Sequence, residues 1–140
     1  MTSHNTPVRQ ITRQIWVAGQ IRPEAMRELA AAGFSHLVNH RPDAEEPGQP
    51  SAEQIAAAAV LAGLKVVTAP VRGLPDVDAV TATREAIDSL GPNDKALLFC
   101  RSGMRSAAAW AMAERLRGAD PDVLRTAAAE AGYDLSRLAL

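Results

Sequence analysis

The sequence predicts an α/β fold in which a mostly parallel central sheet is flanked by helices. Short runs rich in Val, Leu and Ile alternate with longer segments of good helix formers along most of the chain. Capping residues and glycines mark the starts and ends of the helical segments. This alternation favours parallel strands, because a parallel connection needs a long crossover such as a helix.

Each element has a local signal of its own. The predicted strands are QIWVA (14–18), SHLVN (35–39), KVVTAP (65–70) and KALLFC (95–100). The predicted helices are Pro23–Ala32, Ser51–Ala62, Asp76–Leu90, Arg105–Arg117 and Asp122–Ala131. Ser51 and Gln54 have capping-box spacing, and Asp120 is a cap followed by proline at the first helical position. Left-handed C-terminal caps are expected at Gly33, Gly63, Gly91, Gly118 and Gly132.

The 140 residues are the size of one ordinary domain. We expect a flexible segment over residues 1–10 and a single catalytic domain over 11–140. The net charge of -1 gives no general attraction to nucleic acid or an anionic membrane, so we expect neither as a partner. The opening MTSHNTPVRQ lacks the apolar core of a secretory leader, and no run approaches the roughly 18 apolar residues that span a bilayer. A cytoplasmic protein is expected.

Cys100 is the only cysteine, which excludes an internal disulfide and a cysteine-based metal knuckle. It lies in FCRSGMRSA, between a strand and an alanine-rich helix. In such a turn the N–H groups of residues 101–105 should point inward, and the helix amino end adds partial positive charge. Nearby arginines and a helix amino end can lower a cysteine pKa from about 8.5 to roughly 3.5–7.5. We therefore expect a nucleophilic thiolate, since an inert buried thiol leaves the glycine and both arginines unexplained.

Ligands of a parallel sheet collect beyond the carboxyl ends of its strands. Arg105 is a candidate catalytic residue beside Cys100, because it can grip an oxyanion with two parallel hydrogen bonds. Arg41 either contacts the substrate or forms a salt bridge with Glu45 or Glu46. Candidate anion-binding residues around Cys100 are Arg41, Arg72, Arg101, Ser102, Gly103, Met104 and Ser106. Ser102 and Ser106 can donate to the thiolate, although Ser106 can equally act only within the first helical turn.

Four residues separate Cys100 from Arg105 in C-R-S-G-M-R. Rhodanese-type sulfurtransferases also have four, whereas cysteine-dependent phosphatases, C-x-x-G-x-x-R, have five. The shorter loop should draw its donors around the sulfur and leave less room for a tetrahedral phosphate. We therefore expect transfer of sulfane sulfur from thiosulfate or a low-molecular-weight persulfide through a Cys100 persulfide. The acceptor is expected to be an external thiol, because no second cysteine is present to resolve the intermediate.

Two other functions stay open. A phosphatase would form a phospho-enzyme on Cys100 and would need an acid for the leaving alcohol. Asp76 and Asp78 are the candidates for that acid, although Asp76 is better interpreted as a helix N-cap. A non-catalytic anion-binding or redox-sensing module is the third hypothesis. We expect no cofactor and no metal, since His36 and His40 on one strand would lie roughly 13 Å apart.

Four strings, AGQIRPE, AAGFSHLVNHRPDAEEPGQPS, FCRSGMRSA and AGYDLS, resemble the DUF442 family, also called the beta-lactamase hydrolase-like phosphatase-like domain. The resemblance implies a fold similar to dual-specificity protein phosphatases with a rhodanese-length loop. Members are commonly labelled sulfur transferases, and some are fused to a domain similar to persulfide dioxygenases, which implies a partner of that kind. By its motifs, the resemblance makes Cys100 the nucleophile and places Arg41 and Asp43 in a loop facing it. Phe99 and His40 depart from the expected pattern.

Overall fold

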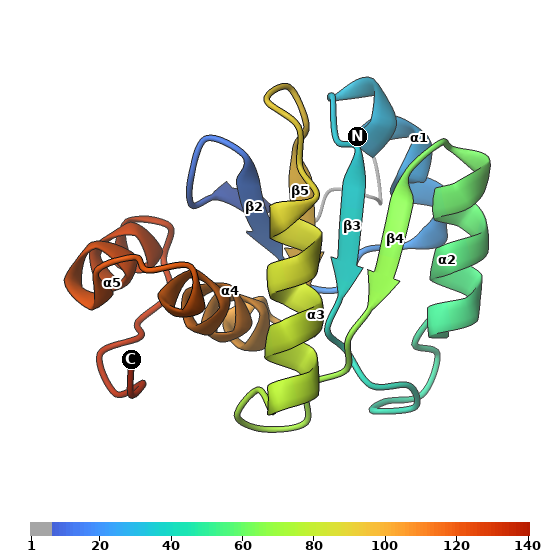
Figure 1. The fold of residues 1–140 in the computed structure, drawn as a ribbon. Coiled ribbons are helices and arrows are strands. Elements are labelled where there is room, and N and C mark those ends of the chain that lie inside the picture. The colour runs from blue at the N-terminus through green and yellow to red at the C-terminus, as the bar shows by residue number, and fades with distance from the viewer. Residues whose placement is uncertain (1–6) are drawn as a thin grey trace.

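A five-stranded sheet with the strand order β1-β2-β5-β3-β4 forms the centre of the protein (Figure 1). The computed structural model describes residues 7–140. The strands are β1 (Val8–Gln10), β2 (Ile15–Ala18), β3 (His36–Asn39), β4 (Lys65–Thr68) and β5 (Ala96–Phe99). The helices are η1 (Pro23–Ala25), α1 (Met26–Ala31), α2 (Ala52–Leu61), α3 (Val77–Asp88), α4 (Met104–Leu116) and α5 (Pro121–Glu130).

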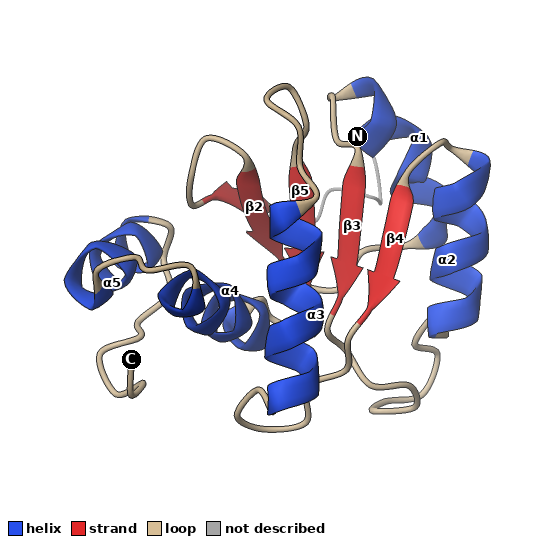
Figure 2. Ribbon diagram, in the orientation of Figure 1, coloured by secondary structure: helices blue, strands red, loops and turns tan. Residues whose placement is uncertain are grey.

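The predicted parallel sheet is confirmed for the four strands β2 to β5, which pair in parallel (Figure 2). The expectation of a flexible segment over residues 1–10 is wrong at Val8–Gln10, which form β1 antiparallel to β2. These three exposed residues carry no strand pattern of their own, and their conformation depends on pairing with the edge of β2. Residues 1–6 of that expected segment lie outside the described residues.

Most predicted helix ends are confirmed. Ser51 and Gln54 make the reciprocal bonds of a capping box at the start of α2, and the Asp120 carboxylate caps α5. The predicted helix at 23–32 divides into the 3₁₀ turn η1 and the short α1. Gly91 is not a left-handed cap, because α3 already ends at Asp88 and the Gly91 N–H instead donates to the Asp94 carboxylate.

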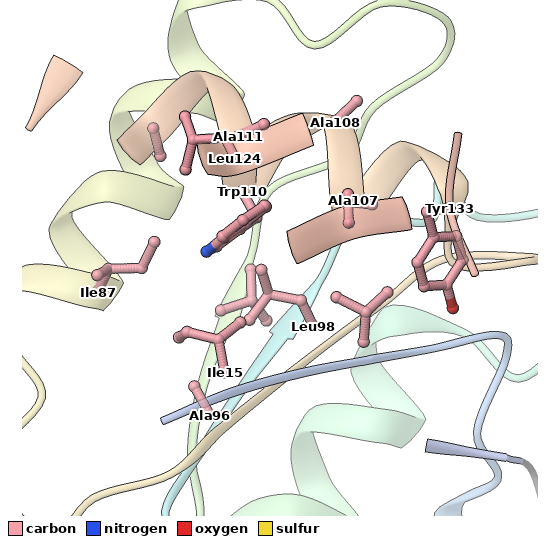
Figure 3. Packing of buried hydrophobic residues seen from close by; sticks show 14 of the residues in the cluster. Ile15, Ile87, Ala96, Leu98, Ala107, Ala108, Trp110, Ala111, Leu124 and Tyr133 are labelled. Carbon is pink, nitrogen blue, oxygen red and sulfur yellow. The ribbon is translucent and has the colours of Figure 1, made fainter. Parts of the chain in front are cut away.

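Successive side chains of β5 point to opposite faces of the sheet, and each face carries its own apolar cluster. Leu97 and Phe99 pack in the cluster beneath α1 and α2, whereas Leu98 packs on the opposite face with residues of α3, α4 and α5. Figure 3 shows this second cluster, in which Trp110 of α4 lies close to Leu98. The same alternation directs the next residue, Cys100, toward α4. Within residues 7–140, no helix combines the length and apolar character needed to cross a membrane.

Replacing Ser51 with alanine should remove the side-chain half of the α2 capping box. We expect a loss of about 1 kcal/mol in the free energy of unfolding, measured by urea denaturation. Ser51→Thr, which keeps the hydroxyl acceptor, is the matched control and should lose much less. Equal losses in the two variants would show that the hydroxyl does not cap this helix.

Candidate active site

The predicted strand–loop–helix arrangement around Cys100 is present. Cys100 directly follows β5, and α4 begins at Met104 with Gly103 as its N-cap residue. The Gly103 N–H donates to Cys100 Sγ at 3.1 Å, and both residues are buried. A main-chain donor therefore points at the sulfur, as an anion cradle at a helix amino end requires.

Gly103 is required here for two independent reasons. Its φ of 98° lies in the left-handed region that side chains disfavour. A β-carbon at this position would also overlap the ring and hydroxyl of Tyr133, which follows α5. Tyr133 belongs to the apolar cluster of α4 and α5 shown in Figure 3. The segment after α5 therefore packs directly against the cysteine loop.

The segment after β2 holds the first peptide groups of the loop. The Gln20 N–H donates to the Arg101 carbonyl at 3.1 Å, and the Cys100 N–H donates to the Ala18 carbonyl at 3.4 Å. A β-carbon on Gly19 would lie 2.8 Å from the Arg101 carbonyl oxygen, so only glycine allows this approach. These two hydrogen bonds hold Cys100 and Arg101, at the start of the loop, against the end of β2 and the residues that follow it.

Arg105 uses one edge of its planar guanidinium to bind Glu45. Nη1 donates to Glu45 Oε2 at 2.8 Å and Nη2 donates to Oε1 at 2.9 Å. Nη1 also donates to the Val71 carbonyl at 2.7 Å. The hydrogens left over, on Nε and Nη2, lie together along the other edge. The pKa of Arg105 is raised, mainly by the Glu45 hydrogen bonds and also by the charge of Cys100, so this guanidinium interacts with both groups.

Glu45 is held as a carboxylate by the two arginines around it. Its pKa is lowered to about 2, first by the hydrogen bond from Arg105 and, against the opposing effect of burial, also by Arg41. The group is therefore ionised at neutral pH. Sequence reasoning considered Glu45 only as a salt-bridge partner of Arg41, and missed its bidentate contact with Arg105.

Arg41 forms the salt bridges that were one of its two predicted roles. Its guanidinium is buried and donates from Nε to Glu45 at 2.9 Å and from Nη2 to Glu46 at 3.0 Å. Nη1 donates to the Gln20 side chain at 3.0 Å. All three nitrogens are therefore used within the protein, and Arg41 positions the loop that carries Glu45 and Glu46.

The other proposed anion ligands are less closely attached to the cysteine. Arg101 is 68% exposed and reaches Glu46 at 4.0 Å, and Arg72 and Met104 are also exposed. The Ser102 hydroxyl accepts from the Met104 N–H at 3.4 Å. Asp43 was expected to face Cys100, but its carboxylate accepts from the Ala52 N–H at the start of α2.

The two candidate acids belong to the first turn of α3. Asp76 is its N-cap, and the carboxylate accepts from the Ala79 N–H at 2.8 Å. The N-cap interpretation of Asp76 is therefore confirmed. Asp78 is exposed one residue into the helix.

A buried hydrogen-bonded chain lies next to the cysteine loop, and sequence reasoning missed it. The Ser106 hydroxyl is 2.8 Å from Nδ1 of His40, and Nε2 of His40 is 2.8 Å from the Thr83 hydroxyl. The pKa of His40 is lowered to about 3, chiefly by burial and further by the charge of Arg105. His40 is therefore neutral. The sequence did carry one signal for this contact. His40 directly follows the predicted strand β3, just as Cys100 directly follows β5, so the two residues were expected at the same edge of the sheet.

Comparison with known proteins places this site in a family. Residues 7–117 match the phosphatase-like domain of beta-lactamase hydrolase-like proteins. The chain belongs to this family. A beta-lactamase hydrolase-like protein of Agrobacterium fabrum is 32% identical over 111 residues, which is 78% of this chain and 25% of that protein. One from Xylella fastidiosa is 31% identical over 129 residues, 91% of this chain and 30% of that protein.

Solved structures confirm the predicted phosphatase-like fold. A Neisseria meningitidis protein provisionally called a phosphatase superposes with a TM-score of 0.76 at 24% identity, covering 92% of this chain and 91% of its own. A DUF442 protein of Shewanella putrefaciens gives 0.66 at 19% identity, with 90% and 93% covered. Kinase associated phosphatase gives 0.74 at 13% identity, with 94% and 85% covered. At these identities the likeness shows the fold alone.

Acid should destabilise the protein through His40. The pKa of His40 in the folded protein, about 3, lies below the ordinary histidine value of 6.5, so between these two pH values the unfolded chain binds more protons. The contribution of His40 to the free energy of unfolding is therefore fully present above pH 6.5. It is lost at about 1.4 kcal/mol per pH unit as the pH drops from 6.5 toward 3. Urea denaturation from pH 7 to pH 5 should show this slope flattened in His40→Gln. The lowered pKa of His36 contributes equally to both proteins, and parallel curves would contradict the account.

Proposed function

We propose that this domain is a cysteine-dependent sulfurtransferase that carries a sulfane sulfur atom on Cys100. The observation that supports it most is the short loop closed on the sulfur. Only four residues separate Cys100 from Arg105, and the Gly103 nitrogen lies 3.1 Å from Cys100 Sγ. Cys100 has no exposed surface. A cradle this tight suits a single added sulfur atom better than a tetrahedral phosphoryl group.

The reaction needs no acid. The Cys100 thiolate attacks the outer sulfur of a persulfide, R–S–SH, forming a new S–S bond while the S–S bond of the donor breaks and R–S⁻ leaves as a thiolate. An external thiolate then attacks the outer sulfur on Cys100, takes it as a persulfide and returns the Cys100 thiolate. The loop amide of Gly103 and the unused edge of Arg105 would hold the negative charge in both steps.

The carboxylates around the site also favour sulfur transfer. Glu45 remains ionised, and the Asp76 carboxylate already caps α3, so a leaving alcohol would have to take its proton from the exposed Asp78 or from an Asp76 that has left its cap. Arg41 and Arg105 are matched by Glu45 and Glu46, which leaves this group formally neutral. A persulfide that reacts as R–S–SH, with no charge on its reacting sulfur, suits that neutral group better than a phosphoester dianion or thiosulfate. The expected partners are a small persulfide, an external thiol and a persulfide dioxygenase-like protein that consumes the product.

Phosphoester hydrolysis is the second candidate, and the names of the family and of its structural neighbours favour it. Cys100 would attack phosphorus, and the Nε–Nη2 edge of Arg105 would bind the phosphoryl oxygens. Asp76 or Asp78 would then have to supply the proton from the first turn of α3.

Treatment with glutathione persulfide should add one sulfur atom to the protein, detected by intact mass spectrometry. Cys100→Ser should show no adduct, because the nucleophile is absent. Arg105→Lys should slow adduct formation about tenfold or more, since lysine cannot form the bidentate contact. Absence of an adduct with glutathione persulfide and with thiosulfate, together with Cys100-dependent hydrolysis of p-nitrophenyl phosphate, would establish the phosphatase instead.

Glu45→Gln should change the preference between donors. Removing the negative charge leaves Arg105 less neutralised, so the doubly charged thiosulfate should gain about three- to tenfold over glutathione persulfide in kcat/KM. Glu53→Gln, which changes an exposed carboxylate on α2, is the control and should leave the ratio unchanged. A ratio that stays constant in Glu45→Gln would show that Glu45 does not set the charge preference.

A further inference from the structure

His40 lies beside Cys100 on the neighbouring strand. In the parallel pair of β3 and β5, Val38 faces Leu98 and Asn39 faces Phe99. The His40 N–H continues this ladder by donating to the Phe99 carbonyl at 2.8 Å. One further step of the register sets His40 opposite Cys100, with both side chains on the α4 face and the strands about 4.8 Å apart. Ser106, in the first turn of α4, contacts His40 on that face.

The hydrogen-bond partners fix the direction of every proton in this chain. The Thr83 hydroxyl donates to the Ala79 carbonyl at 2.7 Å, because a carbonyl can only accept. Thr83 Oγ1 must then accept from His40, which places the imidazole proton on Nε2. A neutral ring has one proton, so Nδ1 carries a lone pair and Ser106 donates its O–H to it.

A protonated ring would reverse this arrangement. An imidazolium donates from both nitrogens, so Ser106 would accept from Nδ1 and its own O–H would be free to turn toward Cys100. Burial and the nearby charge of Arg105 keep His40 neutral, with a pKa of about 3. His40 therefore acts neither as a base for the thiol nor as a cationic partner of the thiolate.

We propose that His40 and Thr83 are positioning residues that hold the Ser106 proton away from the nucleophile. The sulfur then keeps the Gly103 amide and Arg105 as its partners, and the Ser106 hydroxyl donates to His40 instead of to the sulfur. Thiolates that are less stabilised are intrinsically stronger nucleophiles. The network thus tunes Cys100 for attack on sulfur. This inference rests on the proposed nucleophilic role of Cys100, although the network itself can be tested without any substrate.

The tautomer of His40 is the first test. In ¹⁵N-histidine-labelled protein, long-range ¹H–¹⁵N spectra should show Nε2 protonated and Nδ1 bare from pH 5 to pH 8. Thr83→Ser, which keeps the hydroxyl, should preserve this pattern, whereas Thr83→Val should move the proton toward Nδ1. A proton on Nδ1 in the unmodified protein at neutral pH would overturn the proposal.

The reactivity of Cys100 is the second test, measured as the pH profile of its alkylation by iodoacetamide. Ser106→Ala should leave the midpoint unchanged within about 0.3 pH units, because Ser106 does not donate to the sulfur. Thr83→Val should lower the midpoint by about one pH unit by freeing the Ser106 proton, and the double variant Thr83→Val/Ser106→Ala should cancel that shift.

A midpoint raised by about one pH unit in Ser106→Ala alone would overturn the proposal, since it would mean that Ser106 already donates to the thiolate. No shift in Thr83→Val would equally overturn it. Circular dichroism of each variant checks that the fold is intact. Both tests observe the imidazole and the thiol directly, so failure to detect sulfur transfer would leave their results unaffected and would count only against the proposed function.

Discussion

The site depends on how the Arg105 guanidinium is shared: its Nη1–Nη2 edge binds Glu45, and its Nε–Nη2 edge is left for a ligand. Five N–H donors lie in one plane, and Glu45 and the Val71 carbonyl take three of them. The edge that remains is geometrically matched to an oxyanion. Glu45 is in turn bound by the buried Arg41, whose charge would be costly to bury without its two glutamates. The loop after β3 is thereby tied to the start of α4.

Distant segments complete the cradle around Cys100. The backbone N–H of Gln20, after β2, donates to the Arg101 carbonyl, and Tyr133, after α5, packs against Gly103. The glycines at 19 and 103 are explained by these close approaches, and neither contact belongs to the cysteine motif itself. Substitutions in the segments around Gln20 and Tyr133 are therefore expected to act on the active loop, even though the segments lie far from Cys100 in the chain.

Features that depend on neighbouring residues in the sequence were predictable. The parallel strands, the capping box of α2 and the N-cap role of Asp76 follow from local patterns, and the sequence around C-R-S-G-M-R predicted the strand–loop–helix arrangement that holds Cys100 and Arg105. Strand β1 was not predictable, because three exposed residues become a strand only by pairing with β2. The sequence likewise could not decide whether Arg41 binds the glutamates or the substrate, and it could not show the contact between His40 and Ser106. Both depend on residues that come together only when the chain folds.

A structure of the protein after reaction with glutathione persulfide tests the central claim most directly. The account predicts an added sulfur on Cys100 that contacts the Gly103 amide and the Nε–Nη2 edge of Arg105, while Glu45 stays on the Nη1–Nη2 edge. Displacement of Glu45 from Arg105, or an unmodified Cys100 with the added group bound elsewhere, would contradict the division of the guanidinium between the protein and its substrate.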